Sequence, residues 1–134
     1  MNTKFKLTLA MLAGVAIGAA AVTGLHAQAK PPLYLVSEID VTNPEAYGKE
    51  YAPKAQAVIK ASGGRFLAIG GVAGAGAGKV TAFDGEAPKR TTVQVWESME
   101  KYQAYRNLPA FKEARQIGEK YAKFRTFAVE GVPQ

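Results

Sequence analysis

The chain has 134 residues, with 17 lysines and arginines against 11 aspartates and glutamates, one histidine and no cysteine. The lack of cysteine excludes disulfide bonds, thiolate nucleophiles and thiolate metal ligands. The basic residues are scattered among acidic ones and form no block, which argues against a nucleic-acid partner.

The first 29 residues have the pattern of a secretory signal peptide. Lys4 and Lys6 give a basic start, residues 7–25 are uncharged, and residues 27–29 form the small-x-small pattern Ala-Gln-Ala. We expect cleavage after Ala29, a periplasmic or secreted location, and no membrane association after cleavage. The alternative is a membrane anchor formed by residues 7–25, which are just long enough to span a bilayer.

Loss of this leader would change the chemistry of the chain. It removes two basic residues and no acidic one, which leaves 15 minus 11, a net charge of +4. It also removes His26, so the remaining chain would have no histidine. Serine–histidine pairs, structural zinc sites and histidine-ligated haem are then excluded, while tyrosine ligation of haem stays open. We expect no metal and no cofactor, and a domain of 105 residues without disulfides would gain stability from dimerisation.

The first half of residues 30–134 reads as strand, helix, strand. The alternation over Leu33–Val41 predicts a strand with Leu33, Leu35, Ile39 and Val41 on one side. Asn43 as cap, or a Thr42–Glu45 capping box, starts a helix that runs to about Ser62. Pro53 lies inside that helix and predicts a kink or short break. Residues 65–69 form the second strand.

A glycine- and alanine-rich segment follows at Gly70–Lys79. It lacks the residues of a phosphate loop and of the dinucleotide-binding pattern. We interpret it as a mobile hairpin loop, with a lid over a ligand as the alternative. Val80–Phe83 is a candidate for a brief strand, and residues 84–88 form a turn.

Arg90–Trp96 is the predicted third strand. Thr91, Val93 and Val95 fall on one side of it, and the other side carries arginine, threonine, glutamine and tryptophan. Buried polar groups of this kind need partners, unless they face a wet cavity. A helix capped by Ser98 runs to Arg106, a second helix begins at Pro109, and residues 124–129 form the last strand.

Two successive strand–helix–strand halves predict an α+β domain of the ferredoxin-like βαββαβ type, a four-stranded antiparallel sheet with helices on one face. In that topology the first and third strands are central. If Val93 and Val95 pack under the helices, the opposite, uncovered face carries Tyr34, Glu38, Arg90, Gln94 and Trp96. A second copy of the sheet would cover that face and form a homodimer.

Three segments carry a family resemblance: YLVSEIDVTNPEAY at 34–47, GGRFLAIGG at 63–71 and RTTVQVWESME at 90–100. They resemble the domain of unknown function 1330 family, within the dimeric α+β barrel superfamily, over about Leu33–Gly131. The resemblance implies a barrel of two facing sheets. Superfamily members include cofactor-free monooxygenases, muconolactone-type isomerases, haem-degrading enzymes and dye-decolourising peroxidases. The resemblance to the family therefore implies a fold and no single activity.

Two functional hypotheses follow. In the first, the protein is a homodimer whose barrel binds a small aromatic or anionic molecule. The ligand-binding residues would be Tyr34, Arg65, Phe66, Gln94 and Trp96. In the alternative, it is a cofactor-independent monooxygenase- or isomerase-type enzyme, with Glu38 or Asp40 as base and Arg90 or Gln94 stabilising an oxyanion.

Each of these residues also has a structural interpretation. Glu38 would pair with Arg90 across the central strands, and Asp40 would be a turn residue. Trp96 would belong to the core or the dimer interface. Tyr47 and Tyr51 would pack the helix on the sheet, and the charges of Arg65 and Arg115 would be solvated, although Arg115 has the reach to approach the end of the sheet.

Overall fold

The computed structural model of the protein describes residues 30–74 and 76–133. The expected signal peptide, residues 1–29, lies outside the described residues. The elements in chain order are β1 (Leu33–Val41), α2 (Pro44–Ala46), the π-helix η1 (Tyr47–Tyr51), α3 (Ala52–Ala61), β2 (Arg65–Gly71), β3 (Arg90–Trp96), α4 (Met99–Asn107), α5 (Pro109–Gly118) and β4 (Ala122–Glu130).

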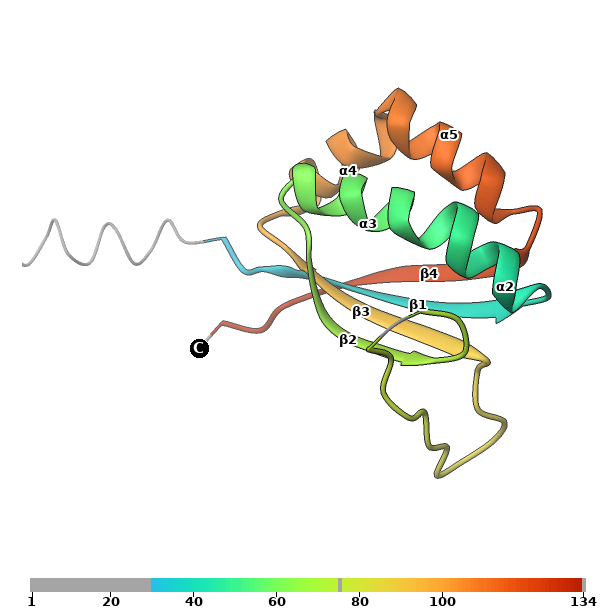
Figure 1. Ribbon diagram of the computed structural model, residues 1–134. Coiled ribbons are helices and arrows are strands. Elements are labelled where there is room, and N and C mark those ends of the chain that lie inside the picture. Colours follow the sequence, from blue (N-terminus) through green and yellow to red (C-terminus); the bar gives the residue numbers. More distant parts are fainter. Residues whose placement is uncertain (1–29, 75, 134) are drawn as a thin grey trace, which may run out of the picture. The chain divides into compact units, whose positions relative to one another are not determined.

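The strands form one antiparallel sheet in the order β2-β3-β1-β4. The helices all lie on one side of the sheet, and the other side has no helix over it (Figure 1). The ferredoxin-like topology and the central pairing of β1 with β3 are therefore confirmed.

The first helical segment changes its winding before Pro53. The Asn43 side chain accepts a hydrogen bond from the N–H of Ala46 at 3.1 Å, and Pro44 takes the first helical position, as expected. The N–H of Ala52 then bonds to the carbonyl of Tyr47, a spacing of five residues that makes η1 a π-helix. Pro53 has no N–H and its ring would clash with the carbonyl four residues earlier, so the wider turn relieves the conflict. The chain stays helical from Pro44 to Ala61, so a change of winding stands where the sequence predicted a kink or short break.

The strand register decides which side chains face the helices. Leu33 lies opposite Trp96, Leu35 opposite Gln94, and Ile39 opposite Arg90. Residues directly opposite each other in a sheet share a face. Because the leucines and Ile39 are buried under the helices, Arg90, Gln94 and Trp96 must be there too.

The expectation that Tyr34, Glu38, Arg90, Gln94 and Trp96 share the uncovered face is therefore wrong. Tyr34 and Glu38 do lie on the uncovered side, whereas the other three face the helices and are at most 9% exposed. Val93 and Val95, the valines that suggested a core side, are half-buried on the uncovered side. The large apolar surface of Trp96, 1% exposed, is what the helices bury instead.

The helix-covered side holds two separate apolar clusters. The first consists of Leu33, Leu35, Ile59, Trp96 and Tyr105. The second consists of Ile39, Val41, Tyr47, Ala52 and Ala122. The aromatic rings of Trp96 and Tyr105 lie 4.7 Å apart between centroids, which ties α4 to the sheet.

Residues 72–89 form the long connection between β2 and β3. Its later part extends away from the sheet on the side opposite the helices (Figure 1), whereas Val72 and Ala73 at its start lie beside Arg90 on the covered side. The expected strand at Val80–Phe83 is not formed, and the Phe83 side chain is 92% exposed. The first part of the connection is ordered by backbone hydrogen bonds from Gly71 N to Gly78 O and from Gly78 N to Ile69 O.

Candidate functional site

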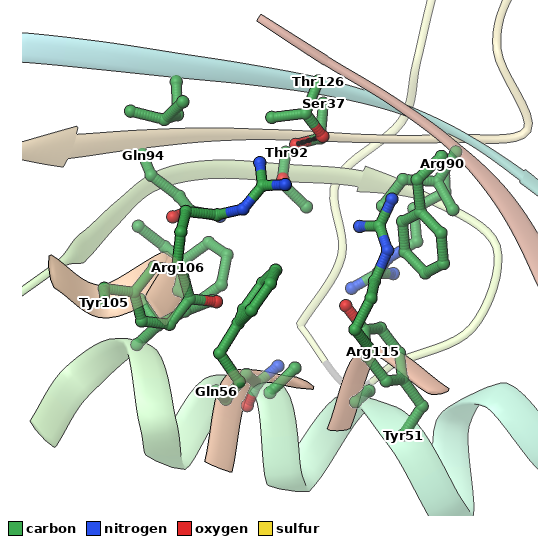
Figure 2. Close-up of a pocket in the computed structure, with 18 of the residues that line it drawn as sticks. Ser37, Tyr51, Gln56, Arg90, Thr92, Gln94, Tyr105, Arg106, Arg115 and Thr126 are labelled. Carbon is green, nitrogen blue, oxygen red and sulfur yellow. Dashed lines mark hydrogen bonds between the residues drawn. The ribbon is translucent and has the colours of Figure 1, made fainter. Parts of the chain in front are cut away.

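A pocket lies between the helix-covered side of the sheet and the helices (Figure 2). Its cavity volume is about 60 Å³. The strands contribute Leu35, Ser37, Ile39, Phe66, Arg90, Thr92, Gln94, Phe124 and Thr126 to its lining. The helices contribute Tyr47, Tyr51, Ala52, Ala55, Gln56, Ile59, Tyr102, Tyr105, Arg106, Phe111 and Arg115.

A row of three hydroxyl side chains crosses the floor of the pocket. Ser37 lies opposite Thr92 on one neighbouring strand and opposite Thr126 on the other. The hydroxyls of Ser37 and Thr126 are 2.9 Å apart and hydrogen-bonded, and Ser37 and Thr92 are 7% and 6% exposed. None of the three belongs to either apolar cluster. The core is thus interrupted by a polar band where packing alone would favour apolar residues.

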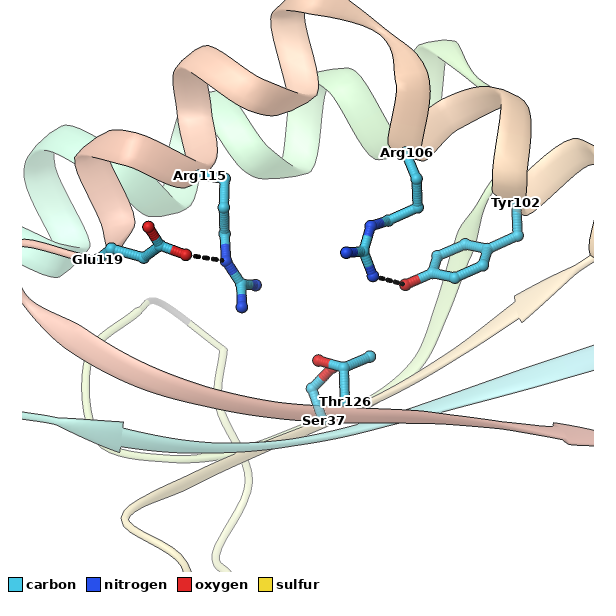
Figure 3. A network of polar contacts seen from close by, with 6 residues as sticks. All are labelled: Ser37, Tyr102, Arg106, Arg115, Glu119 and Thr126. Carbon is cyan, nitrogen blue, oxygen red and sulfur yellow. Dashed lines mark hydrogen bonds and ion pairs between the residues drawn. The ribbon is translucent and has the colours of Figure 1, made fainter.

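Two arginines reach toward this row from the helices. Arg106 comes from α4 and Arg115 from α5, and their guanidinium groups point toward the sheet, with Ser37 and Thr126 beneath the space between them (Figure 3). The Arg115 Nε pairs with Glu119 at 3.0 Å, and its guanidinium carbon lies 3.9 Å from the centre of the Phe124 ring. Glu119 thereby orients Arg115 without occupying its terminal nitrogens in this ion pair.

Arg106 is held mainly by aromatic contacts. Its guanidinium carbon lies 5.0 Å from the ring centre of Phe111, and one terminal nitrogen donates a long hydrogen bond of 3.4 Å to the hydroxyl of Tyr102. Arg106 and Gln56 are exposed, so they stand at the opening of the pocket toward solvent. These contacts are weak enough for the Arg106 side chain to move.

Arg90 is the buried cation of the pocket, 3% exposed. One of its terminal nitrogens donates to the carbonyl of Val72 at 2.9 Å and also to the carbonyl of Ala73. Its Nε is buried and has no hydrogen-bond partner among the described residues. A buried donor without a partner costs about 1–3 kcal/mol, so an acceptor supplied by a ligand would relieve it.

The glycine-rich connection is shaped around Arg90. Gly74 has a φ of +128°, and a Cβ there would lie 3.3 Å from the nearest Arg90 nitrogen. Ala73 also has a positive φ of +63°. A side chain at residue 74 would press on Arg90, which explains glycine there. The segment therefore covers Arg90 with backbone carbonyls.

Three tyrosines of the pocket, Tyr47, Tyr51 and Tyr105, are neutral hydrogen-bonding groups. Burial raises the pKa of Tyr51 and of Tyr105 well above the usual value, and it also raises the pKa of Tyr47 against the opposing effect of Arg90. Within the described residues, no aspartate or glutamate lines the pocket. The pocket thus offers cations and neutral donors, a combination suited to an anion and lacking a carboxylate base.

The structure divides the residues that the sequence predicted for the site. Phe66, Arg90 and Gln94 line the pocket, whereas Trp96 lies beside it in the core and donates from its indole N–H to the Gln94 side-chain oxygen at 3.0 Å. Arg65 is exposed at the start of β2, and Tyr34 is half-buried on the uncovered side. Neither lines this pocket.

Glu38 and Asp40 are also separated from this pocket. Glu38 pairs with Arg125 on β4 at 3.1 Å, so the expected pairing with Arg90 is wrong. Asp40 pairs with Lys89 at 2.9 Å, and the hydrogen bond and charge of Lys89 lower the pKa of its carboxyl. The two carboxylates line a separate, open hollow together with Glu86 and the basic residues around them.

Sequence reasoning missed Ser37, Thr92, Thr126 and Arg106 as site residues. One signal was present: Ser37 falls on the side of β1 that otherwise carries leucine, isoleucine and valine. A serine inside an apolar stripe marks a place where the core is interrupted. The pocket position of Arg106 depends on where α4 ends, which the sequence pattern does not give.

Solved structures show the class of fold to which this arrangement belongs. The chain is similar to SnoaB, a cofactor-independent oxygenase from Streptomyces nogalater, with a TM-score of 0.55, 10% identity, and 78% of this chain and 96% of that chain covered. It is also similar to the RPA0582 protein of Rhodopseudomonas palustris, of unknown function, with a TM-score of 0.57 and 14% identity. That match covers 84% of this chain and 91% of the other chain. A third similar structure is a provisionally assigned antibiotic biosynthesis monooxygenase from Caulobacter crescentus, with a TM-score of 0.52 and 14% identity. The match covers 78% of this chain and 93% of that chain.

These similarities define a ferredoxin-like fold of the dimeric α+β barrel class. At such low identities they concern the fold alone. The chain belongs to the family described as Domain of unknown function (DUF1330), whose model matches residues 32–132. No curated protein matches the chain. In the part of the chain that the structure describes, no helix is long and apolar enough to cross a membrane.

Proposed function

We propose that the pocket between the sheet and the helices binds a small acidic molecule with an aromatic or otherwise flat body. The observation that carries this proposal is the charge of the pocket: Arg90, Arg106 and Arg115 line it, and no carboxylate does among the described residues. Arg90 is buried without a carboxylate partner among the described residues, and Arg115 has only Glu119 at its Nε. An anionic ligand is favoured, because its charge would offset the desolvation of these cations.

The walls of the pocket suit a flat ligand. Phe66, Tyr105 and Phe111 lie beside the polar floor and provide apolar faces. The cavity of about 60 Å³ is smaller than the few hundred Å³ of most ligand sites. Entry of such a ligand therefore requires movement at the opening, where Arg106 and Gln56 are exposed.

A second candidate function is catalysis by a cofactor-independent oxygenase or isomerase. The fold similarity to SnoaB favours it, as do the guanidinium and phenol groups, which can stabilise a developing oxyanion or enolate. Among the residues that the structure describes, the pocket has no carboxylate base, so the substrate would have to ionise to water or arrive as an anion. We rank binding first for that reason.

We also propose that two copies associate through the uncovered side of the sheet. Phe127 and Val129 are 39% and 51% exposed there, and Val36 and Val93 form a half-buried pair at its centre. An apolar sheet face of this kind favours an interface between copies. The leader-like pattern of residues 1–29 supports export to the periplasm or the medium.

Calorimetric titration with benzoate, benzyl alcohol and benzylamine tests the binding proposal, because these three ligands have similar shapes and different charges. We expect benzoate to bind best and benzylamine worst. Arg115→Gln should weaken benzoate binding about tenfold or more, as expected for the loss of a charged hydrogen bond. Arg125→Gln removes the same charge from the uncovered side and should leave binding unchanged. Equal affinity for all three ligands would contradict the proposal.

Dioxygen uptake separates the two candidate functions. If the protein is an oxygenase, a quinol should cause dioxygen consumption that Arg115→Gln reduces. Consumption that disappears in Glu38→Gln instead would locate the chemistry in the open hollow beside Arg125. Saturable binding of benzoate without turnover of the quinol would support the binding function.

A further inference from the structure

We propose that the pocket holds acidic ligands in their ionised form, because it places the ligand oxyanion between Arg106 and Arg115 above the Ser37–Thr126 hydroxyl pair. This inference deepens the proposed function and rests on it. It adds a definite position for the anionic group and a ligand class, phenols and enols, whose pKa the pocket would lower.

The facing arginines are the first argument. Arg106 and Arg115 come from consecutive helices, α4 and α5, and their guanidinium groups approach the same space from two sides (Figure 3). Two like charges directed at one space repel each other, and the repulsion is stronger where water is partly excluded. An oxyanion between them would convert this repulsion into two charge-assisted interactions.

The floor of the same space supplies a hydrogen-bond donor. In the Ser37–Thr126 hydrogen bond, one hydroxyl donates to the other, and the accepting hydroxyl keeps its own proton. That proton is free to point at a ligand oxygen. Thr92, opposite Ser37 on β3, extends the hydroxyl row beneath the space.

The charged groups around this space are predominantly cationic. Arg90 faces the pocket from β3, Arg106 from α4 and Arg115 from α5. Glu119, the C-cap residue of α5, pairs with the Nε of Arg115 and cancels part of one charge. Gln56, the pocket residue of α3 that stands at the opening, is uncharged.

The remaining titratable groups are phenols. Tyr47 and Tyr51 face the pocket from η1, and Tyr102 and Tyr105 from α4. Burial raises the pKa of Tyr47, Tyr51 and Tyr105 further above the ordinary value of 10.0, so these phenols carry no negative charge at neutral pH. Neither β2 nor β4 contributes an acidic lining residue. The surrounding field therefore favours the anion over the neutral acid, which is the condition for a lowered ligand pKa.

Titration of para-nitrophenol measures this effect directly, since the phenolate absorbs visible light and the phenol does not. We expect the pKa of the bound probe to fall by about 1 or more relative to the free probe, the shift that nearby opposite charges produce. Arg106→Gln and Arg115→Gln should each return the pKa toward the free value. Arg115→Lys, which keeps the charge, should retain part of the shift, and Arg125→Gln should retain it fully.

The outcomes separate this inference from the binding proposal. If para-nitrophenol binds with an unchanged pKa, the ionisation inference is wrong and binding stands. The ionisation inference is also wrong if benzoate binds and the phenol does not. If neither probe binds to a protein whose circular dichroism shows the native fold, both proposals fall. A melting curve for each variant identifies those that are unfolded, and Arg115→Lys then provides the test with the least disturbance.

Discussion

Ser37 and Thr126 are hydrogen-bonded at 2.9 Å across neighbouring strands, between two apolar clusters on the covered side of the sheet. Hydroxyls contribute little to the stability of a core, because apolar residues of the same shape would pack there as well. Their presence beneath two arginines is therefore better explained by a ligand than by folding.

Replacing the hydroxyl pair should separate stability from function. Ser37→Ala with Thr126→Val removes both partners together, so no buried donor or acceptor is left unpaired. We expect the free energy of unfolding to change by less than about 1 kcal/mol or to rise, and benzoate affinity to fall. Urea unfolding and calorimetric titration on the same samples measure both. A large loss of stability with unchanged affinity would mean that the pair is structural.

Gly64 should not tolerate a side chain. A Cβ at this position would lie 2.4 Å from Cζ2 of Trp96 and 2.8 Å from Cγ2 of Ile59. Gly64→Ala is expected to lower the free energy of unfolding by about 1–3 kcal/mol, the usual range for overpacking. Chemical denaturation followed by Trp96 fluorescence measures the change.

Gly48 provides the matched control for that substitution. It lies in η1, and a Cβ there would meet nothing within 4 Å. Gly48→Ala should stabilise the protein by about 0.5–1 kcal/mol, because alanine loses less conformational entropy in a helix. If both alanine variants destabilised the protein equally, the packing of Trp96 against Gly64 would not be the cause.

Alkaline pH should destabilise the fold through Tyr51. Burial raises the pKa of Tyr51 above its ordinary value of 10.0, so the folded state retains a proton that the unfolded state loses. This contribution to stability is complete below pH 10.0 and is lost as the pH rises further. Tyr51→Phe has no proton to lose and should show a smaller decline of the urea midpoint above that pH. Identical pH profiles for both proteins would contradict the assignment.

A lysine on the uncovered side should dissociate the proposed dimer. Val93 is half-buried at the centre of that face, opposite Val36. Val93→Lys would bury a charge in the interface and shift the protein to monomers in light scattering after size exclusion. Ala110→Lys adds the same charge to the exposed surface of α5 and should leave the dimer intact. A monomeric wild-type protein would contradict the interface.

The fold could be predicted because its signals are local. Asn43 and Pro44 mark a helix start, Pro53 marks a break, and Ser98 accepts a hydrogen bond from the N–H of Lys101 at 3.2 Å as an N-cap. Each of these follows from the chemistry of one residue and its neighbours. They needed no knowledge of the tertiary structure.

The orientation of β3 could not be predicted in the same way, because both of its sides are mixed. Val93 and Val95 indicated one side as core, and Trp96 indicated the other. The register with Leu33 and Leu35 settles the question in favour of Trp96. A polar side of a strand is thus compatible with a covered position when a pocket interrupts the core. The polar chemistry of Arg90 and Gln94 correctly predicts that they need partners, which they find on the covered side of the sheet.

A crystal structure of the protein with bound benzoate tests the proposed site most directly. We expect the carboxylate to lie between Arg106 and Arg115, above Ser37 and Thr126, with the ring toward Phe111. Benzoate bound on the uncovered side of the sheet, beside Tyr34 and Val95, would contradict the proposed site. The ligand would then bind between the sheets of two copies.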